Sequence, residues 1–466
     1  MRSRINKKDE MILVFGGVFI LQIFLLLCFA NIPTEKFVLP YCIILFYCVF
    51  YLIYLKIYRY CTRVVGFFMT LLTCIRYLII PCFILLDENY LSYTPLDRGA
   101  NGMYFQEGCL LTLWEAMVVG VFLAYAFPRW YRQERQKIQV TCAGTDVLWI
   151  EIGVLCLVIL VVPSVLSTYN FVLRLSDAEV HADLANGGGG LYVLGLMCAR
   201  VLKIVFPIPF VQYFYSRYMK SRKSRYYYGS ALVLGVFYAL IMEGNSRNSI
   251  IIPAVAVFLV LYYLYPAFRK MTVVFCGGGI VCIAGVTLIW KSFLGNVGEA
   301  SVKPFSYWIA YVEQYFAGIA NMGRAVLAKE YYGGINPKML FSDLFQSTPF
   351  VSGMIDSSET SAYYFLKIWD RNDQVIPSTG NGLFYFGYLL APLVPVFIII
   401  LAHFFEKKVQ KAVTVPETII YIYAAVTVAY NIFNAVSSLG MKLSIYILPA
   451  VLVVYLNKKF RLRKVA

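Results

Sequence analysis

The chain has 466 residues, of which 60% are hydrophobic and 14% charged, and its mean hydropathy of +0.70 is far above that of soluble domains. This composition excludes an ordinary soluble enzyme. The formal net charge of +16 is better explained as a membrane-topology signal and as attraction to anionic lipids than as a nucleic-acid-binding surface, so no nucleic-acid partner is expected.

Runs of about 20 apolar residues, long enough to cross a hydrocarbon core of ~30 Å as a helix, recur along most of the chain. The sequence therefore predicts an all-α polytopic membrane protein with about 12 transmembrane helices. Their expected ranges are 11–30, 37–55, 64–86, 109–127, 147–167, 191–214, 226–242, 249–265, 271–290, 382–404, 417–435 and 443–457. The first range follows a basic start without a small-residue cleavage site, so we expect a retained helix and not a signal peptide.

The distribution of Lys and Arg over alternate loops predicts the orientation. With residue 1 in the cytoplasm, the loops placed inside carry 26 of the 41 Lys and Arg residues, and the loops placed outside carry 12. An even number of helices then puts both termini in the cytoplasm. The longest outer segment lies between the ninth and tenth helices. The expected parts are helices 1 to 9 (1–290), an extracytoplasmic loop domain (291–381), and helices 10 to 12 with a basic cytoplasmic tail (382–466).

Within the outer loop, apolar residues recur at helical spacing and predict an amphipathic helix over 304–330. The apolar stripe is formed by Phe305, Trp308, Ile309, Val312, Phe316 and Ile319. A second stripe, at spacings of four, four and three residues, is formed by Glu313, Ala317, Asn321 and Arg324. The glycines and proline of "YYGGINP" are expected to end this helix, which would lie in the membrane interface or cover a cavity.

Metal and cofactor sites have little support in the sequence. The 12 cysteines include no Cys-x-x-Cys pair, which argues against a disulfide framework and a thiolate metal site. His181 and His403 are predicted on opposite sides of the membrane. The run Gly187–Gly190 lacks the Lys-Ser/Thr of a phosphate-binding loop and is interpreted as a hinge. We expect no cofactor and no metal, although a carboxylate-bound Mg²⁺ or Ca²⁺ would leave little trace in a sequence.

Ionisable residues within transmembrane helices are costly unless they face a partner or a polar cavity. The predicted helices contain Arg76, Glu115, Glu151, Arg200 and Lys203. Glu151 and Lys203 are close enough to helix ends to reach the interface. For Arg76 two interpretations stay open: an ion pair with Glu115 that fastens the bundle, or a place in a cationic cavity for an anionic head group. The same two kinds of role stay open for Arg200.

The stretch "MEGNSRNSIIIPAVAVFL" places Arg247 in a predicted outer turn between two apolar helices. Lys and Arg are depleted from short outer turns, and the flanking Gly244, Asn245 and Ser246 leave backbone N–H groups available for an anion. A guanidinium also matches the geometry of phosphate oxygens. The alternative interpretation is an ordinary solvated loop arginine.

Two stretches of the chain resemble a known family. "NSRNSIIIPAVAVFL" is similar to the Ser-Arg motif and following apolar helix of bacterial O-antigen and capsular polysaccharide polymerases (Wzy-type) and of the related O-antigen ligases. "STGNGLFYFGYLLAPLVP" resembles, with approximate spacing, their Asn-x-x-(Tyr/Phe)-x-x-x-Gly pattern, with Asn381 as its asparagine. The resemblance covers about 240–400. Ligases usually have a histidine just before that asparagine, and Thr379-Gly380 here favours a polymerase.

The resemblance implies a metal-independent glycosyltransferase of the bacterial cytoplasmic membrane. It would transfer a growing glycan from undecaprenyl diphosphate to a new lipid-linked repeat unit. A chain-length regulator and a flippase would be further partners, and membrane lipids would surround the protein.

Arginines would stabilise the departing diphosphate, and a carboxylate would deprotonate the acceptor hydroxyl. We predict Arg247, Arg324 and Glu313 as catalytic residues, although Arg324 matches only loosely a polymerase pattern with a glycine eleven positions later. The predicted substrate-binding residues are Arg200, Arg76, Asn245, Asn321 and Asn381. Other candidate bases are Asp343, Asp356, Glu359 and Asp370.

Four other functions stay open: a lipid-linked oligosaccharide flippase, an O-antigen ligase, a polyprenyl-phosphate-sugar transferase and a generic solute transporter. A flippase also has about 12 helices and a cationic cavity, but it needs no large outer domain. The discriminating observation is chemical, because an enzyme joins repeat units whereas a transporter moves them unchanged.

Overall fold

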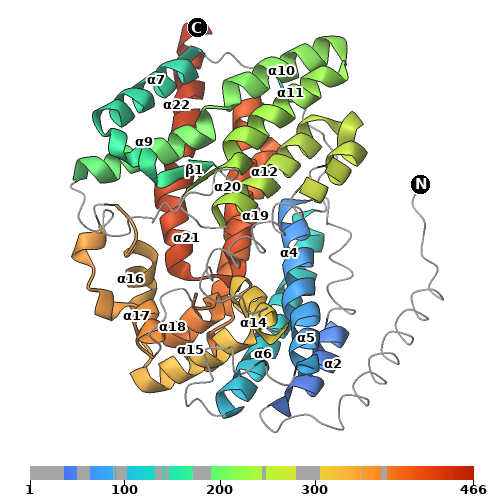
Figure 1. The fold of residues 1–466 in the computed structure, drawn as a ribbon, viewed down its shortest axis with the longest axis vertical. Helices are drawn as coiled ribbons and strands as arrows, with labels where there is room; N and C mark the ends of the chain where they lie inside the picture. The colour runs from blue at the N-terminus through green and yellow to red at the C-terminus, as the bar shows by residue number, and fades with distance from the viewer. Residues whose placement is uncertain are drawn as a thin grey trace, which may run out of the picture.

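The computed structural model describes residues 36–49, 63–87, 90, 102–131, 140–141, 146–171, 190–243, 248–275, 277–279, 305–349, 351–368 and 375–465. Over these residues the fold is almost entirely helical, with one two-stranded sheet (Figure 1). Long upright helices form a bundle, and shorter helices cover its lower end in the view of Figure 1. We call this lower end the cap end.

The first part of the bundle comes from the N-terminal half of the chain. Its helices are α2 (Leu39–Val49), α4 (Val64–Cys74), η5 (Ile75–Ile79), α5 (Ile80–Leu86), α6 (Gly102–Trp130), α7 (Asp146–Val161), η7 (Pro163–Thr168), α9 (Gly190–Val205) and α10 (Ile208–Ser221). The helices that follow are α11 (Ser224–Leu234), η8 (Gly235–Leu240), α12 (Asn248–Leu264) and η9 (Pro266–Phe268). Strands β1 (Tyr169–Phe171) and β2 (Ile241–Glu243) pair antiparallel, with Tyr169 opposite Glu243.

The C-terminal part completes the bundle with α19 (Leu393–Lys411), α20 (Val415–Tyr430), η12 (Asn431–Phe433), α21 (Val436–Lys442), η13 (Leu443–Ile447) and α22 (Leu448–Val465). Helix α20 is central: 89% of its most apolar stretch is buried, and it packs against α4, α10, α12, α19 and α22. Thr414 and Glu417 form a capping box that fixes where α20 begins.

The apolar helices confirm a multi-pass all-α membrane protein. Within the described residues five helices are long and apolar enough to cross a membrane, or up to seven if each of two bent pairs is one span. The range 64–86 is one of them, as predicted. The range 11–30 and most of 271–290 lie outside the described residues, so the total of 12 stays a prediction.

Two predicted boundaries near the C-terminus are wrong. The expected single helix over 382–404 is α18 (Ser378–Leu390) followed by α19, and the two are bent by 114°. A Cβ on Gly382 would overlap the backbone of Ala391, and Gly387 has φ of +74°, so these glycines allow the chain to fold back. The turn expected over 436–442 is helix α21, and it continues through η13 into α22.

The cap is formed by α14 (Phe305–Tyr315), α15 (Ile319–Tyr332), α16 (Met339–Phe345), η10 (Ser352–Met354), η11 (Ser357–Glu359), α17 (Ser361–Lys367) and α18. The single helix predicted over 304–330 is therefore wrong, because the chain breaks between Tyr315 and Ile319. Ala317 has φ of 47°, and a Cβ on Gly318 would overlap the Glu313 side chain. The predicted end of the helix is confirmed: α15 stops at Tyr332, and Gly333 is left-handed with φ of 75°.

Segments that the sequence assigns to one side of the membrane meet each other in the structure. At the cap end, Lys36 Nζ donates to the carbonyl of Ile84 at 3.1 Å, and the hydroxyl of Ser306 donates to Asp87 at 2.7 Å. At the opposite end, the backbone N–H of Thr141 donates to the carbonyl of Val413 at 2.7 Å. The grouping of loops into two faces therefore agrees with the fold, while their assignment to inside and outside stays a prediction.

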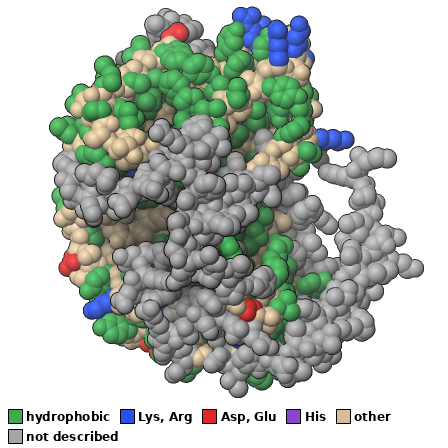
Figure 2. Space-filling view, in the orientation of Figure 1, with side chains coloured by type: hydrophobic (Ala, Val, Ile, Leu, Met, Phe, Trp, Pro, Cys, Tyr) green, Lys and Arg blue, Asp and Glu red, His purple; other side chains and the backbone are tan. Residues whose placement is uncertain are grey.

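The end opposite the cap carries a cluster of exposed positive charge (Figure 2). Among the described residues visible in Figure 2 many side chains are hydrophobic, and Lys and Arg gather at the upper right, where α10 and α11 meet in Figure 1. The exposed cations in this connection are Arg217, Lys220, Arg222, Lys223 and Arg225. We call this the basic end, and its charge favours the cytoplasmic side.

Candidate functional site

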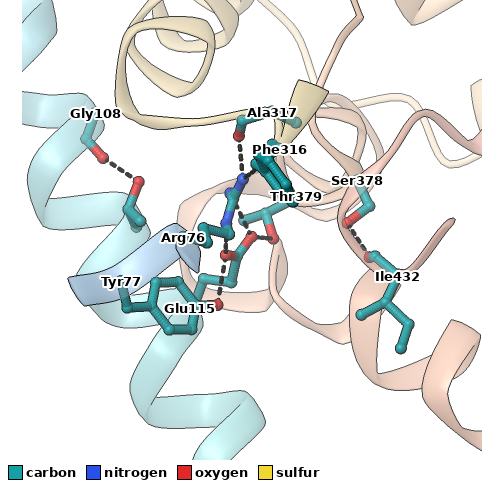
Figure 3. Close-up of polar contacts among 10 residues, drawn as sticks. Arg76, Tyr77, Gly108, Glu115, Phe316, Ala317, Ser378, Thr379 and Ile432 are labelled. Atoms are coloured by element: carbon teal, nitrogen blue, oxygen red, sulfur yellow. Dashed lines mark hydrogen bonds and ion pairs between the residues drawn. The ribbon is translucent and has the colours of Figure 1, made fainter. Parts of the chain in front are cut away.

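Arg76 and Glu115 form a fully buried ion pair near the cap end (Figure 3). Arg76 lies on η5 and Glu115 on α6, and the guanidinium donates from Nε at 2.9 Å and from Nη2 at 3.3 Å to the two carboxylate oxygens. The carboxylate also accepts from the hydroxyls of Tyr77, at 2.7 Å, and Thr379. Of the two interpretations left open for Arg76, the ion pair with Glu115 is the one that the structure contains.

The same guanidinium fastens the cap to the bundle. Arg76 Nη1 donates to the carbonyls of Phe316 and Ala317, at the break between α14 and α15 (Figure 3). Thr379, which hydrogen-bonds Glu115, lies on α18. Arg76 therefore has protein partners at Nε, Nη1 and Nη2. This geometry favours the structural interpretation over the predicted role in substrate binding.

Arg200 lies in a second polar centre, which is more open. Its Nε donates to Glu243 Oε1 at 2.8 Å, and Nη2 contacts the same oxygen. The guanidinium carbon lies 5.0 Å from the ring centroid of Tyr446, whose hydroxyl donates to the other oxygen of Glu243. The side chains of Arg200 and Glu243 are 13% and 18% exposed, so this pair is reachable, unlike Arg76 and Glu115.

Lys203 lies near this pair, and Lys442 lies one helical turn from Tyr446, which contacts the pair. Lys203, half-buried and less than one turn further along α9, lies within electrostatic range of Glu243 and makes no hydrogen bond to any described residue. Lys442, also half-buried, is one turn before Tyr446 and donates to Asn431 Oδ1 at 3.2 Å. We call Arg200, Lys203 and Lys442 the cationic cluster. Glu243 neutralises one of its three charges, and the remainder fits an anionic ligand.

The Ser-Arg turn follows this cluster in the chain. Glu243 ends β2 and Asn248 begins α12. Between them, Asn245 and Arg247 lie outside the described residues, so their roles stay predictions. In sequence, Arg247 is four positions after the carboxylate that binds Arg200.

Arg324 and Asn321 lie on α15 and are both buried. The Arg324 guanidinium lies 4.4 Å from the ring centroid of Phe365 on α17. Asn321 Oδ1 accepts no hydrogen bond from the described residues. The stripe expected to bring Glu313 and Arg324 together is broken at Ala317, so the prediction that they share one helix face is wrong.

Glu313 is a buried acid that caps α15. Its Oε1 accepts from the backbone N–H of Ala320 at 2.8 Å, and its Oε2 accepts from the hydroxyl of Tyr90. Loss of hydration on burial raises the pKa of the Glu313 carboxyl to about 7, against the lowering effect of these hydrogen bonds. A pKa in this range suits a general base, but the carboxylate is only 3% exposed.

Asp343 is the second buried acid of the cap, and it joins three of its helices. Its carboxylate on α16 accepts from the hydroxyl and N–H of Ser361 at the start of α17, and from the hydroxyl of Tyr385 on α18. Burial raises the pKa of Asp343 to about 6. Asn381 extends the network, since Nδ2 donates to Ser361 Oγ at 2.6 Å and Oδ1 accepts from the N–H of Val436 at 3.1 Å. Asn381, predicted to bind substrate, is thus engaged in holding α17, α18 and α21 together.

The remaining predicted bases lie at the surface or outside the described residues. Asp356 precedes η11, Glu359 is its last residue, and both are exposed; Asp370 is not among the described residues. Within the described part of the chain there is no group of three or more metal-ligating side chains.

Sequence reasoning missed Glu243, Lys442 and Tyr446. Glu243 directly follows the helix predicted over 226–242, where an acidic residue is expected to be solvated. Lys442 was assigned to an outer turn because small polar residues precede it. A helical continuation of "SSLGMKLSIYIL" would have placed Lys442 and Tyr446 on one helix one turn apart, and this was the available signal.

Three π-helical segments among the described residues carry members of these centres. They are η5 with Arg76, η13 with Tyr446, and η8, which leads into β2 and Glu243. Such segments are frequent at functional sites because the widened turn redirects side chains. Two of the three adjoin the cationic cluster.

Comparison with known proteins adds no relative. No family model, curated protein or solved structure matches this chain. The function is therefore argued from the geometry of the cationic cluster and from the resemblance of the two short motifs.

Proposed function

We propose that this protein is a polymerase that joins polyprenyl-diphosphate-linked oligosaccharide repeat units at the outer face of the bacterial cytoplasmic membrane. The observation that carries the proposal is the cationic cluster. Arg200, Lys203 and Lys442 are half-buried in apolar helices, with one acid to balance them, beside the strand that leads into the Ser-Arg turn. Cations in apolar surroundings are retained where they bind an anion.

The reaction that fits is transfer of a glycan between two lipid-linked substrates. The bond between the anomeric carbon of the donor glycan and its diphosphate oxygen breaks, and a hydroxyl oxygen of the acceptor repeat unit bonds to that carbon. The hydroxyl proton passes to a base, and the lipid diphosphate leaves with the bonding electron pair. Fixed cations stabilise the charge that develops on the leaving diphosphate.

The proposal gives the predicted residues different roles. Arg247 and the cationic cluster would bind the diphosphate, and Glu243 would orient the Arg200 guanidinium by its hydrogen bonds. Asp356 and Glu359, exposed carboxylates of the cap, are better placed to receive a proton than the buried Glu313.

The test is elongation in liposomes by the purified protein supplied with a lipid-diphosphate-linked repeat unit. We expect the wild type to produce a ladder of longer lipid-linked glycans. Arg247→Ala, Arg247→Lys and Lys442→Gln should reduce the ladder strongly at matched folded amounts. Lys338→Gln, which removes an exposed cap lysine, is the matched control and should elongate normally.

The assay also separates the polymerase from its alternatives. Movement of unchanged substrate across the bilayer, without elongation by the wild type, would refute the enzyme and support a flippase. Transfer of the glycan to an added lipid A core without repeat-unit joining would support a ligase. Normal elongation by Lys442→Gln would remove Lys442 from the diphosphate site.

A further inference from the structure

A cavity in the cap end adjoins the cationic cluster. Its volume is about 230 Å³, and it lies between α17, the segment before α18, and α21. Seven of its lining residues are apolar and three are serines: Ser347, Ala362, Phe365, Leu366, Val375, Ile376, Ala435, Ser437, Ser438 and Met441. It is smaller than sites for drug-sized ligands, which begin at about 300 Å³.

We infer that this cavity is a subsite for one sugar ring, the ring of the donor glycan that carries the diphosphate. The inference rests on the proposed function and names where substrate selection would occur. A pyranose has apolar C–H faces and a rim of hydroxyls. Phe365 and the aliphatic residues match the faces, and the three serines match the hydroxyls.

The serines differ in how they are used. Ser438 donates to Asn431 Oδ1 at 3.1 Å. Ser347 and Ser437 make no hydrogen bond to any described residue, so their hydroxyls can serve a ligand. A polyprenyl chain would leave these hydroxyls without partners, which favours the sugar over the lipid tail as occupant.

A shared residue connects the cavity with the cationic cluster. Asn431 Oδ1 accepts from Ser438, which lines the cavity, and from Lys442 Nζ at 3.2 Å. The next residue before Lys442, Met441, also lines the cavity. The Lys442 side of the cluster therefore borders the cavity, and a diphosphate bound by Lys442 would have its sugar next to it.

Binding measurements on the purified full-length protein test the subsite without requiring turnover. The two probes are a farnesyl-diphosphate-linked repeat unit and farnesyl diphosphate without sugar. The variant Ser347→Ala/Ser437→Ala removes two hydroxyls, and Ala362→Leu fills part of the cavity. Ser352→Ala/Ser357→Ala, at exposed cap positions, is the matched control.

We expect Ser347→Ala/Ser437→Ala to bind the sugar-bearing probe about tenfold more weakly, the size expected from two lost hydrogen bonds. Ala362→Leu should also weaken this probe, because its larger side chain occupies space in the cavity, and both variants should bind farnesyl diphosphate as the wild type does. Lys442→Gln should weaken both probes. Equal weakening of both probes by the cavity variants would assign the cavity to the lipid, and unchanged binding of both would refute the subsite. If the sugar-bearing probe binds as expected but the wild type does not elongate glycans, only the polymerase proposal is refuted. If the wild type elongates glycans but the cavity variants bind both probes normally, only the subsite is refuted.

Discussion

The buried pair of Arg76 and Glu115 gives the most direct test of how the cap is held. Arg76→Met removes the cation and leaves a carboxylate at 0% exposure with only the hydroxyls of Tyr77 and Thr379 to compensate it. Breaking a buried pair in this way costs about 3–5 kcal/mol. The carbonyls of Phe316 and Ala317 also lose their donor, so the cap and the bundle should loosen together.

The matched control is an exposed pair in the same protein. Lys458 Nζ lies 2.7 Å from Glu417, and the lysine is 56% exposed. Because solvent screens such a pair, Lys458→Met should cost at most about 1 kcal/mol. Unfolding of the purified proteins in mixed micelles, followed by denaturant titration, measures both free energies. A loss for Arg76→Met no larger than that for Lys458→Met would refute the reasoning.

The double variant Arg76→Met/Glu115→Leu separates a structural role from substrate binding. With both charges removed, no uncompensated ion stays buried, so the double variant should be more stable than either single variant, by about 2 kcal/mol. If Arg76 only fastens the cap, the folded double variant should still elongate glycans. Restored stability with lost elongation would instead return Arg76 to the substrate site.

Three further predictions concern the cap and the bundle. Glu313→Gln should flatten the pH dependence of stability. The pKa of Glu313 in the folded protein, about 7, lies above the ordinary 4.5, so the protonated carboxyl stabilises the fold fully below about pH 4.5. In the wild type this contribution of about 3 kcal/mol is lost as the pH rises through 7. Melting curves from pH 4.5 to 8 check it, and an unchanged slope would contradict it. Gly440→Ala should destabilise by about 1–3 kcal/mol, because its Cβ would overlap the backbone of Leu344 on α16, whereas Gly153→Ala, with open space around it, should be neutral or slightly stabilising. Thr414→Ala should cost about 1 kcal/mol by removing the N-cap of α20, and Thr414→Ser should restore most of it; equal stability of the two variants would argue against the capping box.

Hydropathy predicted the helices of the bundle that consist of one long apolar run. The helix over 64–86 follows from a continuous apolar run, and the pairing of Arg76 with Glu115 follows from their similar depth on adjacent helices. Hydropathy could not predict the bend after Leu390, because an apolar segment has the same hydropathy whether its helix continues or bends. Pro392 and Gly387 were the only cues there.

The cap was less predictable because its geometry depends on contacts distant in sequence. At the break between α14 and α15, Ala317 is left-handed and the Glu313 side chain accepts a hydrogen bond from the start of α15. The spacing of apolar residues in the sequence indicates neither feature. The small residues of α21 are typical of a turn, so the sequence predicts one there. In the structure they allow close packing instead, since Gly440 lies against the backbone of Leu344. Of the cationic cluster, only Arg200 was predicted from the sequence as a binding residue.

The way the cap is attached bears on the choice between an enzyme and a transporter. Buried polar contacts join it to the bundle at three places: Arg76 at the break between α14 and α15, Thr379 on α18, and Asn381 at the start of α21. Alternating access requires one end of a transporter to open and close, and each buried contact opened here would leave polar groups unpaired. A cap fixed in this way therefore favours a permanently closed cap end over the opening and closing that alternating access requires.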